Sequence, residues 1–244
     1  MKHIVKSDSE ESQLFESWKQ TWNLTKEDLL NNSLLREQKK EIWEKLSGTN
    51  KENLKTALLN EQGFICCYCQ QRIELDSKTI IEHFIARDIQ PEKMFDYENL
   101  FACCDGGDKD RENPNSRRMP LYCDRKKANK TLAVNPLDEY CETHFKYIFN
   151  ENPEEPEVII EGISKEGQEA IESLNLNISK FRTLRGLALV NSIFDKINDE
   201  YVRISDDDIN DLIVVIKQRK TDGWFEPFCV VLDNVLRNMV NNTD

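Results

Sequence analysis

Four cysteines in two separated groups constrain the fold of this chain more than any other feature of its sequence. Cys66 and Cys69 have the Cys-x-x-Cys spacing, and Cys104 and Cys123 form a second, wider pair. Paired thiolates of this kind close a tetrahedral zinc site, which holds distant stretches of chain together. The neighbouring Cys103 is an alternative to Cys104, and buried apolar thiols or a redox centre are alternatives to metal. We expect structural zinc at Cys66, Cys69, Cys104 and Cys123.

Length and composition describe a globular protein. The chain has 244 residues, of which 39% are hydrophobic and 32% charged, enough to bury a core. No apolar run reaches the length needed to span a bilayer, and the first residues lack the apolar core of a signal peptide. We therefore expect a cytoplasmic protein without membrane association. In that compartment thiols stay reduced, so eight clustered cysteines favour metal binding over disulfides.

Charge is distributed unevenly along the chain. The net charge is −12, yet residues 103–130 carry eight Lys and Arg against five Asp and Glu. Local positive charge attracts the phosphates of nucleic acid. The predicted phosphate-binding side chains are Arg117, Arg118, Arg125, Lys126, Lys127 and Lys130, with an ordinary solvated face as the alternative. Residues 131–244 carry twice as many acidic as basic residues and would repel nucleic acid, so they suit solvent or a protein partner.

Hydrophobic periodicity predicts an α+β fold that is predominantly helical. Apolar residues recur at helical spacing over 8–62, whereas Lys78 to His83 is rich in β-branched residues and predicts a strand. Glycines, asparagines and prolines predict a loop over 105–120, and the acidic, proline-rich 150–157 segment suits a linker. Further helices are expected over 164–176, 178–201, 205–220 and 225–241. We expect an N-terminal helical region over 1–63, a metal-bound core over 64–130 and an acidic helical region over 131–244.

A Glu-His pair lies between the two cysteine groups, where zinc would hold it in place. An imidazole titrates near neutrality, so His83 can take a proton from water. The carboxylates of Glu82 and Asp124 are hard oxygen donors for Mg²⁺ or Mn²⁺, and Asn99 can orient the loop after the histidine. Each has an ordinary alternative, such as a satisfied histidine, a solvated charge, a turn former or a helix cap. Together they indicate metal-dependent cleavage of a phosphodiester.

These motifs resemble those of the HNH endonucleases, whose ββα-metal core is often held by such a zinc. The residues that carry the resemblance are Cys66-x-x-Cys69, Glu82-His83, Asn99-Leu100, Cys104 and Cys123-Asp124-x-x-Lys127. The segments Ile81-Glu82-His83-Phe84, Glu142-Thr143-His144-Phe145 and Leu174-Asn175-Leu176-Asn177 are similar to the PtuB type found with retrons and in Septu antiphage systems. The HNH likeness covers roughly residues 64–130, and the PtuB likeness extends over most of the chain.

The resemblance implies a role for each matching residue. It makes His83 the general base, Glu82 and Asp124 the ligands of the catalytic metal, and Asn99 the residue that positions the loop carrying the histidine. Lys127 matches a basic residue near the phosphate. Glu82 stands where Asp is more usual, and Asp124 where Asn or His is usual. The extra negative charge should make activity strictly dependent on bound metal.

The resemblance also implies a biological setting. It predicts DNA hydrolysis in antiphage defence, together with an ATPase of the PtuA type and, in retrons, a reverse transcriptase and its DNA. The acidic C-terminal half is the candidate docking surface for the ATPase. Two alternatives remain, namely the same chemistry on RNA such as host tRNA, and a zinc-binding adaptor without catalytic activity.

Overall fold

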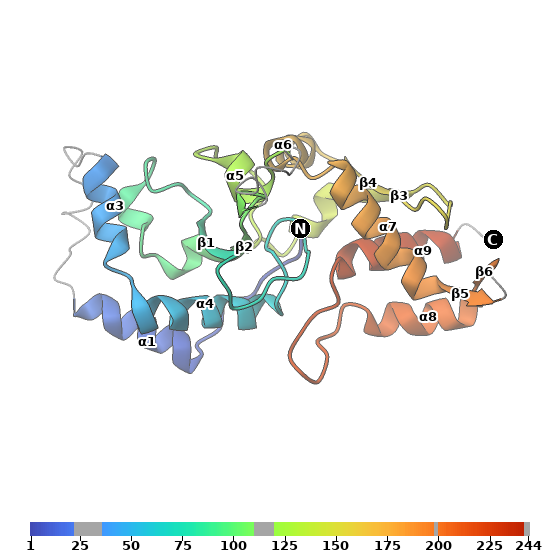
Figure 1. The fold of residues 1–244 in the computed structure, drawn as a ribbon, viewed down its shortest axis with the longest axis horizontal. Coiled ribbons are helices and arrows are strands. Elements are labelled where there is room, and N and C mark those ends of the chain that lie inside the picture. Colours follow the sequence, from blue (N-terminus) through green and yellow to red (C-terminus); the bar gives the residue numbers. More distant parts are fainter. Residues whose placement is uncertain (22–35, 110–119, 198–199, 242–244) are drawn as a thin grey trace.

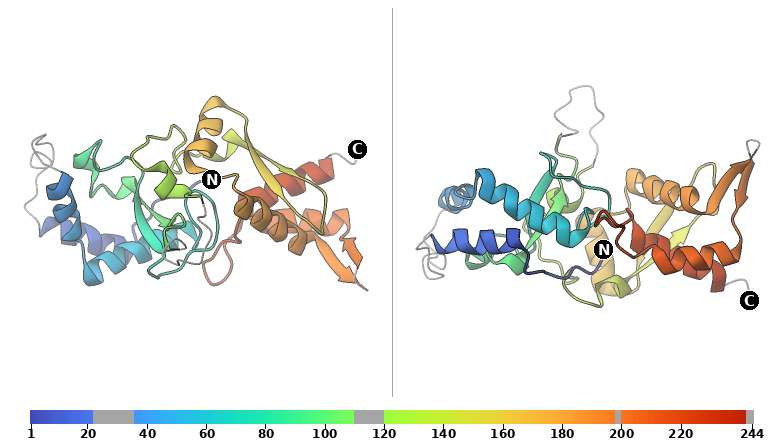
Figure 2. Two further views of the ribbon diagram at one scale, coloured as in Figure 1. Left: turned by 45° about the horizontal axis from the view of Figure 1, so that its top comes forward. Right: turned by 90° about the horizontal axis from the view of Figure 1, so that it is seen from below.

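The computed structural model describes residues 1–21, 36–109, 120–197 and 200–241. It is elongated, with two lobes side by side along its long axis (Figures 1 and 2). One lobe contains helices α1 (Glu10–Gln20), α3 (Arg36–Glu44) and α4 (Gly48–Gln62) around a small sheet. The other contains further helices and two hairpins. The expected α+β class is confirmed, with helices combined with small antiparallel sheets.

The sheet of the first lobe carries both groups of predicted functional residues. Strand β1 (Thr79–His83) pairs antiparallel with β2 (Leu100–Cys104), and the 3-10 helices η1 (Pro91–Lys93) and η2 (Tyr97–Asn99) lie between them in sequence. The register places Thr79 opposite Cys104 and His83 opposite Leu100. The Glu-His pair and the cysteines therefore lie at opposite ends of one short ladder. Helix α5 (Cys123–Lys127) packs against β2.

Helix α4 holds this sheet in place through a buried amide. The Gln62 side chain donates to the carbonyl of Ala102 at 2.7 Å and accepts from the Ala102 N–H at 2.7 Å, which satisfies the free edge of β2. The helix ends at Gly63 in the left-handed conformation with a φ of 57°. A Cβ at Gly63 would lie 2.3 Å from the ring of Phe225, so this close approach requires glycine.

The second lobe is built from the C-terminal half of the chain. Its elements are η4 (Cys141–His144), β3 (Phe145–Phe149), β4 (Val158–Gly162), α6 (Lys165–Leu174), α7 (Ser179–Ile193), β5 (Phe194–Ile197), β6 (Glu200–Arg203), α8 (Asp206–Val215) and α9 (Cys229–Asn241). A buried guanidinium organises its interior, because Arg185 donates to the carbonyls of Val158 and Leu176 at 3.0 Å each. Asn177 also accepts from Arg185, at 3.2 Å.

Two predictions about this lobe are wrong. The proposed linker over 150–157 is the turn of the β3–β4 hairpin, in which the Asn150 side chain bonds the Glu155 carbonyl and the Glu157 N–H. The helix predicted over 178–201 ends at Ile193, and the chain continues into the β5–β6 hairpin. Aromatic and β-branched residues on both strands favour the extended conformation there.

The three predicted regions are in contact with one another. The Phe225 N–H donates to the Gly63 carbonyl at 2.9 Å, and the Phe228 N–H donates to the Gln70 carbonyl at 3.1 Å. Near the start of the chain, the Ile4 N–H donates to the Pro136 carbonyl at 2.8 Å. The division into three domains stays a prediction. No helix in the described ranges is long and apolar enough to cross a membrane.

Candidate functional site

A cluster of buried thiols lies at the end of β2. The Sγ atoms of Cys66, Cys103, Cys104 and Cys123 all lie within 4.8 Å of one another. Cys66 Sγ is 3.6 Å from Cys103 Sγ and 3.7 Å from Cys104 Sγ. Four sulfurs around one zinc ion, each at the usual bond length, would be separated by about 3.8 Å. The donor set and its spacing therefore fit a metal ion held by sulfur.

The structure and the sequence prediction differ in the fourth cysteine of the metal site. The tightest group contains Cys103, whereas the predicted set contains Cys69, whose Sγ lies 4.0 Å from Cys104 Sγ. Neighbouring residues inside a strand point to opposite faces, yet at the end of β2 the Sγ atoms of Cys103 and Cys104 both lie within 4.8 Å of those of Cys66 and Cys123. Five thiols thus compete for four positions, and the choice of Cys69 stays a prediction.

The backbone explains why cysteines so far apart in sequence meet. After Cys69 the chain turns tightly at Gln70, whose φ is 64°, and the Gln70 N–H donates to the Cys66 carbonyl at 3.1 Å. On the other side, the Tyr122 N–H donates to the Gly106 carbonyl at 3.2 Å. A Cβ at Gly106 would lie 2.4 Å from the Tyr122 carbonyl oxygen, so glycine permits this closure. The loop that follows Cys104 therefore returns to its origin before Cys123.

The thiols differ in how readily they lose a proton. Burial raises the pKa of Cys66, but contacts with the thiols of Cys103 and Cys104 outweigh it and leave the pKa well below its ordinary value. The same kind of contact, Cys103 first, lowers the pKa of Cys104 to about 6. Burial raises the pKa of Cys69 and Cys123. A cluster that already favours two thiolates is suited to a cation, because thiolate is the form that binds metal.

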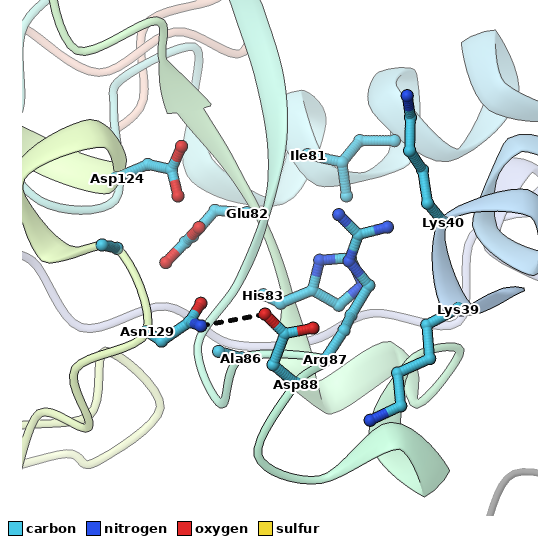
Figure 3. A pocket seen from close by; sticks show the side chains of 11 residues that line it. Lys39, Lys40, Ile81, Glu82, His83, Ala86, Arg87, Asp88, Asp124 and Asn129 are labelled. Carbon is cyan, nitrogen blue, oxygen red and sulfur yellow. Dashed lines mark hydrogen bonds between the residues drawn. The ribbon is translucent and has the colours of Figure 1, made fainter. Parts of the chain in front are cut away.

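The second candidate metal site is a carboxylate pair at the other end of β1. Glu82 is buried, and its Oε1 accepts from the Tyr68 hydroxyl at 2.8 Å and lies 2.7 Å from Lys127 Nζ. The carboxylates of Glu82 and Asp124 lie next to each other in Figure 3. Burial first, and then the Asp124 carboxylate, raise the pKa of Glu82 well above its ordinary value, although Lys127 opposes this. Excess negative charge on oxygen donors fits a hard divalent cation.

The His83 imidazole lies beside this pair in a fixed orientation. Its Nε2 is 3.0 Å from the carbonyl oxygen of Met94, and its ring meets the Trp43 ring edge-on with centroids 4.5 Å apart. Burial first, and then the nearby Arg87, lower the pKa of His83 to about 3, so the ring is neutral at pH 7. Because a carbonyl only accepts, Nε2 carries the proton and Nδ1 keeps its lone pair. This tautomer leaves Nδ1 able to accept a proton.

Asn99 ties together the loop that follows the histidine. Its Oδ1 accepts from the Ile85 N–H at 2.7 Å, and its Nδ2 donates to the carbonyls of Ile85 and Lys93 at 3.0 Å each. The Phe84 N–H in turn donates to the Asn99 carbonyl at 2.9 Å. These bonds fix the backbone on both sides of the segment that carries the Met94 carbonyl. The geometry agrees with a role in positioning His83.

These side chains open onto one pocket of about 500 Å³. It is lined by Lys39, Lys40, Ile81, Glu82, His83, Ala86, Arg87, Asp88, Asp124, Ala128 and Asn129. Asn129 Nδ2 donates to Asp88 Oδ2 at 2.9 Å (Figure 3). Sequence reasoning missed Lys39 and Lys40, because a helix of alternating charges shows no sign of which face meets the site. It also missed Arg87 and Asp88, which follow His83 by four and five residues and are close in sequence to the predicted site.

The structure describes four of the six predicted phosphate-binding residues. Arg117 and Arg118 lie outside the described residues, and Lys126 and Lys130 are exposed. Arg125 is exposed and forms an ion pair with Asp108. Lys127 corrects the prediction, because its side chain is 1% exposed and its ammonium faces Glu82 and the His83 carbonyl. Its position three residues after Asp124 turns it inward, so it neutralises the carboxylate instead of meeting phosphate.

Removal of the Lys127 charge should destabilise the protein strongly. We expect Lys127→Met to lower the free energy of unfolding by about 3–5 kcal/mol, because Glu82 is left buried without its partner. The loss should shrink at low pH, where Glu82 takes up a proton. Urea denaturation of the metal-loaded protein measures it. The double variant Lys127→Met with Glu82→Gln should recover most of the stability, and a single variant as stable as the wild type would contradict this account of the pair.

Comparison with known proteins places this geometry in context. Over 128 residues the chain is 25% identical to the Septu protein PtuB of Bacillus thuringiensis, which is 52% of this chain and 42% of that protein. Over 87 residues it is 30% identical to the retron Vc95 putative HNH endonuclease of Vibrio cholerae serotype O1 biovar El Tor, covering 34% of this chain and 38% of the relative. The resemblance to HNH proteins of the PtuB type is confirmed. No protein-family model matches the chain.

The PtuB-type resemblance is limited in extent. The aligned part spans about two fifths of the length of each curated relative, 42% and 38%. The comparisons leave the activity, the roles of individual residues, the substrate and the partners as proposals.

Proposed function

We propose that this protein is a metal-dependent HNH-type endonuclease that hydrolyses phosphodiester bonds in DNA during antiphage defence. The observation that carries the proposal is the meeting of Glu82, Asp124 and a neutral His83 at one pocket. A carboxylate pair beside an imidazole with a fixed tautomer provides a cation site and a proton acceptor together. The similarity to PtuB and to a putative retron HNH endonuclease supports this choice among hydrolases.

In the proposed mechanism His83 Nδ1 accepts a proton from the water that attacks phosphorus. The Met94 carbonyl holds the ring through Nε2, and Asn99 holds the loop that supplies this carbonyl. Glu82 and Asp124 hold Mg²⁺ or Mn²⁺, which supplies charge stabilisation for the phosphate and the leaving 3′ oxygen when bound. Glu82 and His83 end β1, Asn99 immediately precedes β2 and Asp124 lies in α5, so these residues follow the element order of a ββα-metal core.

Two further features support the proposed chemistry. An anionic phosphate next to the ring favours imidazolium, so substrate binding should raise the pKa of His83 from its low value towards neutrality. Structural zinc, proposed at Cys66, Cys69, Cys104 and Cys123, fixes the start of α5 and thereby Asp124. The same thiols require a reducing compartment, in agreement with a cytoplasmic site of action.

A cleavage assay tests the proposal directly. Plasmid, single-stranded DNA and total RNA are incubated with the full chain in Mg²⁺, in Mn²⁺ and in chelator, with and without a PtuA-type ATPase. We expect cleavage of DNA that disappears in chelator. Preferential cleavage of RNA would identify RNA as the substrate in place of DNA. No cleavage under any condition would favour a metal-bound adaptor without catalytic activity.

We further propose that the acidic C-terminal half docks on an ATPase of the PtuA type. Asp207 and Asp211 are exposed one turn apart on α8, near the exposed Val214 and Val215. Charge reversal of Asp207 and Asp211 to Lys should abolish co-purification with the ATPase. The same change at the exposed Glu52 and Glu74 of the other lobe is the control. Undiminished co-purification of the α8 variant would reject this docking surface.

A further inference from the structure

Helix α3 presents its lysines to the pocket described above. Lys39 lies four positions before Trp43 and Lys40 lies three positions before it, so both lysines share the side of the helix that carries Trp43. Lys39 and Lys40 line the pocket, and Figure 3 shows both side chains on the wall opposite Asp124. Glu41 and Glu44 do not line it, although Glu44, four residues after Lys40, forms an exposed ion pair with Lys40 at 3.6 Å. The helix is therefore polarised, with its basic side towards the candidate catalytic residues.

Aromatic contacts fix this helix against the catalytic imidazole. The Trp43 ring lies edge-on to His83 at 4.5 Å and stacks on Phe95 at 5.6 Å. The Arg87 guanidinium lies 5.2 Å from the centroid of the Trp43 ring, in the range of a cation–π contact. Trp43 is one turn from Lys39, so these contacts anchor the part of α3 that carries the lysines beside His83. Lys39 and Lys40, called the basic wall below, therefore belong to the same pocket as the imidazole.

The charge balance of the pocket requires such a wall if an anion is to enter. Glu82, Asp88 and Asp124 place three carboxylates around it in a chain whose net charge is −12. Lys127 is buried on Glu82 and is not available to a phosphate. A metal ion offsets the carboxylate pair, but it leaves the phosphates on either side of the cleaved bond without a cation. Of the residues that line the pocket, Lys39, Lys40 and Arg87 are the cations that can meet such phosphates.

We propose that Lys39 and Lys40 bind the backbone phosphates of a DNA strand that runs through the pocket between α3 and α5. Arg87, between the lysines and the imidazole, completes the basic wall. Contacts of this kind fix the register of the strand and read no sequence. The inference rests on the proposed nuclease function and assigns the substrate-binding surface of that site to the N-terminal helical region.

The test separates binding from cleavage. Fluorescence anisotropy measures the affinity for labelled single-stranded DNA, duplex DNA and RNA over a range of salt, in the presence of Mg²⁺ and in a His83→Gln background that does not cut. Lys39→Gln with Lys40→Gln should weaken binding about tenfold at low salt and reduce the slope of log K against log salt by about 1.4 on single-stranded DNA. A merely structural effect would leave this slope unchanged.

A matched control exists on helix α6. Lys40 is 71% exposed and lies 3.6 Å from Glu44, four residues away, and Lys165 is 84% exposed with Glu169 in the same relation at 3.6 Å. Lys165→Gln with Lys146→Gln removes the same charge far from the pocket and should leave the slope at the wild-type value.

The outcomes distinguish this proposal from the nuclease itself. Equal slopes for the α3 variant and the control overturn the basic wall, even if the wild type cuts DNA. Absence of any binding to DNA by the parent protein also overturns it. Reduced slope in the α3 variant supports the wall, even if no condition yields cleavage and the nuclease proposal fails. Tighter, equally lysine-dependent binding of RNA would overturn DNA as the strand bound.

Discussion

Replacement of His83 by glutamine is expected to lower the rate of phosphodiester cleavage by about 10³-fold. Glutamine can still donate a hydrogen bond towards the Met94 carbonyl, but it has no imidazole to accept a proton. The metal content and the melting temperature should stay close to those of the wild type. Single-turnover cleavage in Mg²⁺, with metal analysis of the same sample, measures both effects.

A second histidine provides the control for this substitution. His144 is half-buried, and its Nδ1 lies 2.6 Å from the Ser164 hydroxyl, away from the pocket residues. His144→Gln should leave the cleavage rate within a fewfold of the wild type. If His83→Gln retained full activity, His83 could not be the general base. The carboxylates with bound metal would then have to activate water alone.

Removal of the metal from the thiol cluster is expected to unfold the region around β2 and α5. Structural zinc contributes about 10–16 kcal/mol in small zinc-dependent modules, more than the whole stability of an ordinary domain. Cys104→Ser should therefore release metal and lower the melting temperature sharply. Metal analysis and thermal unfolding by circular dichroism measure these two quantities. Cleavage should be lost with the metal, because Asp124 follows a cluster cysteine directly.

A series of single substitutions identifies the fourth ligand. Cys69→Ser should release the metal and Cys103→Ser should retain it, because Cys103 alternates with Cys104 along the strand. Cys141 and Cys229 are equally buried but lie outside the cluster, so their serine variants are the controls. The reverse result would assign the ligand to Cys103. A Cys104→Ser protein that kept full metal and stability would contradict the site itself.

The sequence predicts the chemistry of this protein better than its surfaces. Spacing and residue type identify the cysteine cluster and the Glu82–His83 pair, because metal sites and strand ends leave local signals. The inward position of Lys127 leaves no such signal, since a long basic side chain is expected to be solvent-exposed at any position of a sequence. The roles of Lys39 and Lys40 depend on how α3 packs against β1. That contact joins residues more than 40 positions apart, beyond the reach of local periodicity.

The same limit explains the errors in the C-terminal half. The sequence predicts a linker at the turn of the β3–β4 hairpin and a helix over most of the β5–β6 hairpin, because acidic turns and short mixed segments carry weak patterns. The conformation of these segments depends on hydrogen bonds to buried residues that are distant in sequence. Asn177 bonds both the N–H and the carbonyl of Ile160, which holds β4 in its place.

The segment between α8 and α9 mechanically couples the two lobes. Arg72 donates to the Phe225 carbonyl at 2.6 Å, and Gln70 accepts from the N–H groups of Phe228 and Val230, immediately beyond the turn that bears Cys69. Through these bonds the segment joins the helices of the second lobe to the turn beside the cysteines, so a displacement of α8 or α9 would be passed directly to the metal-binding end of the first lobe.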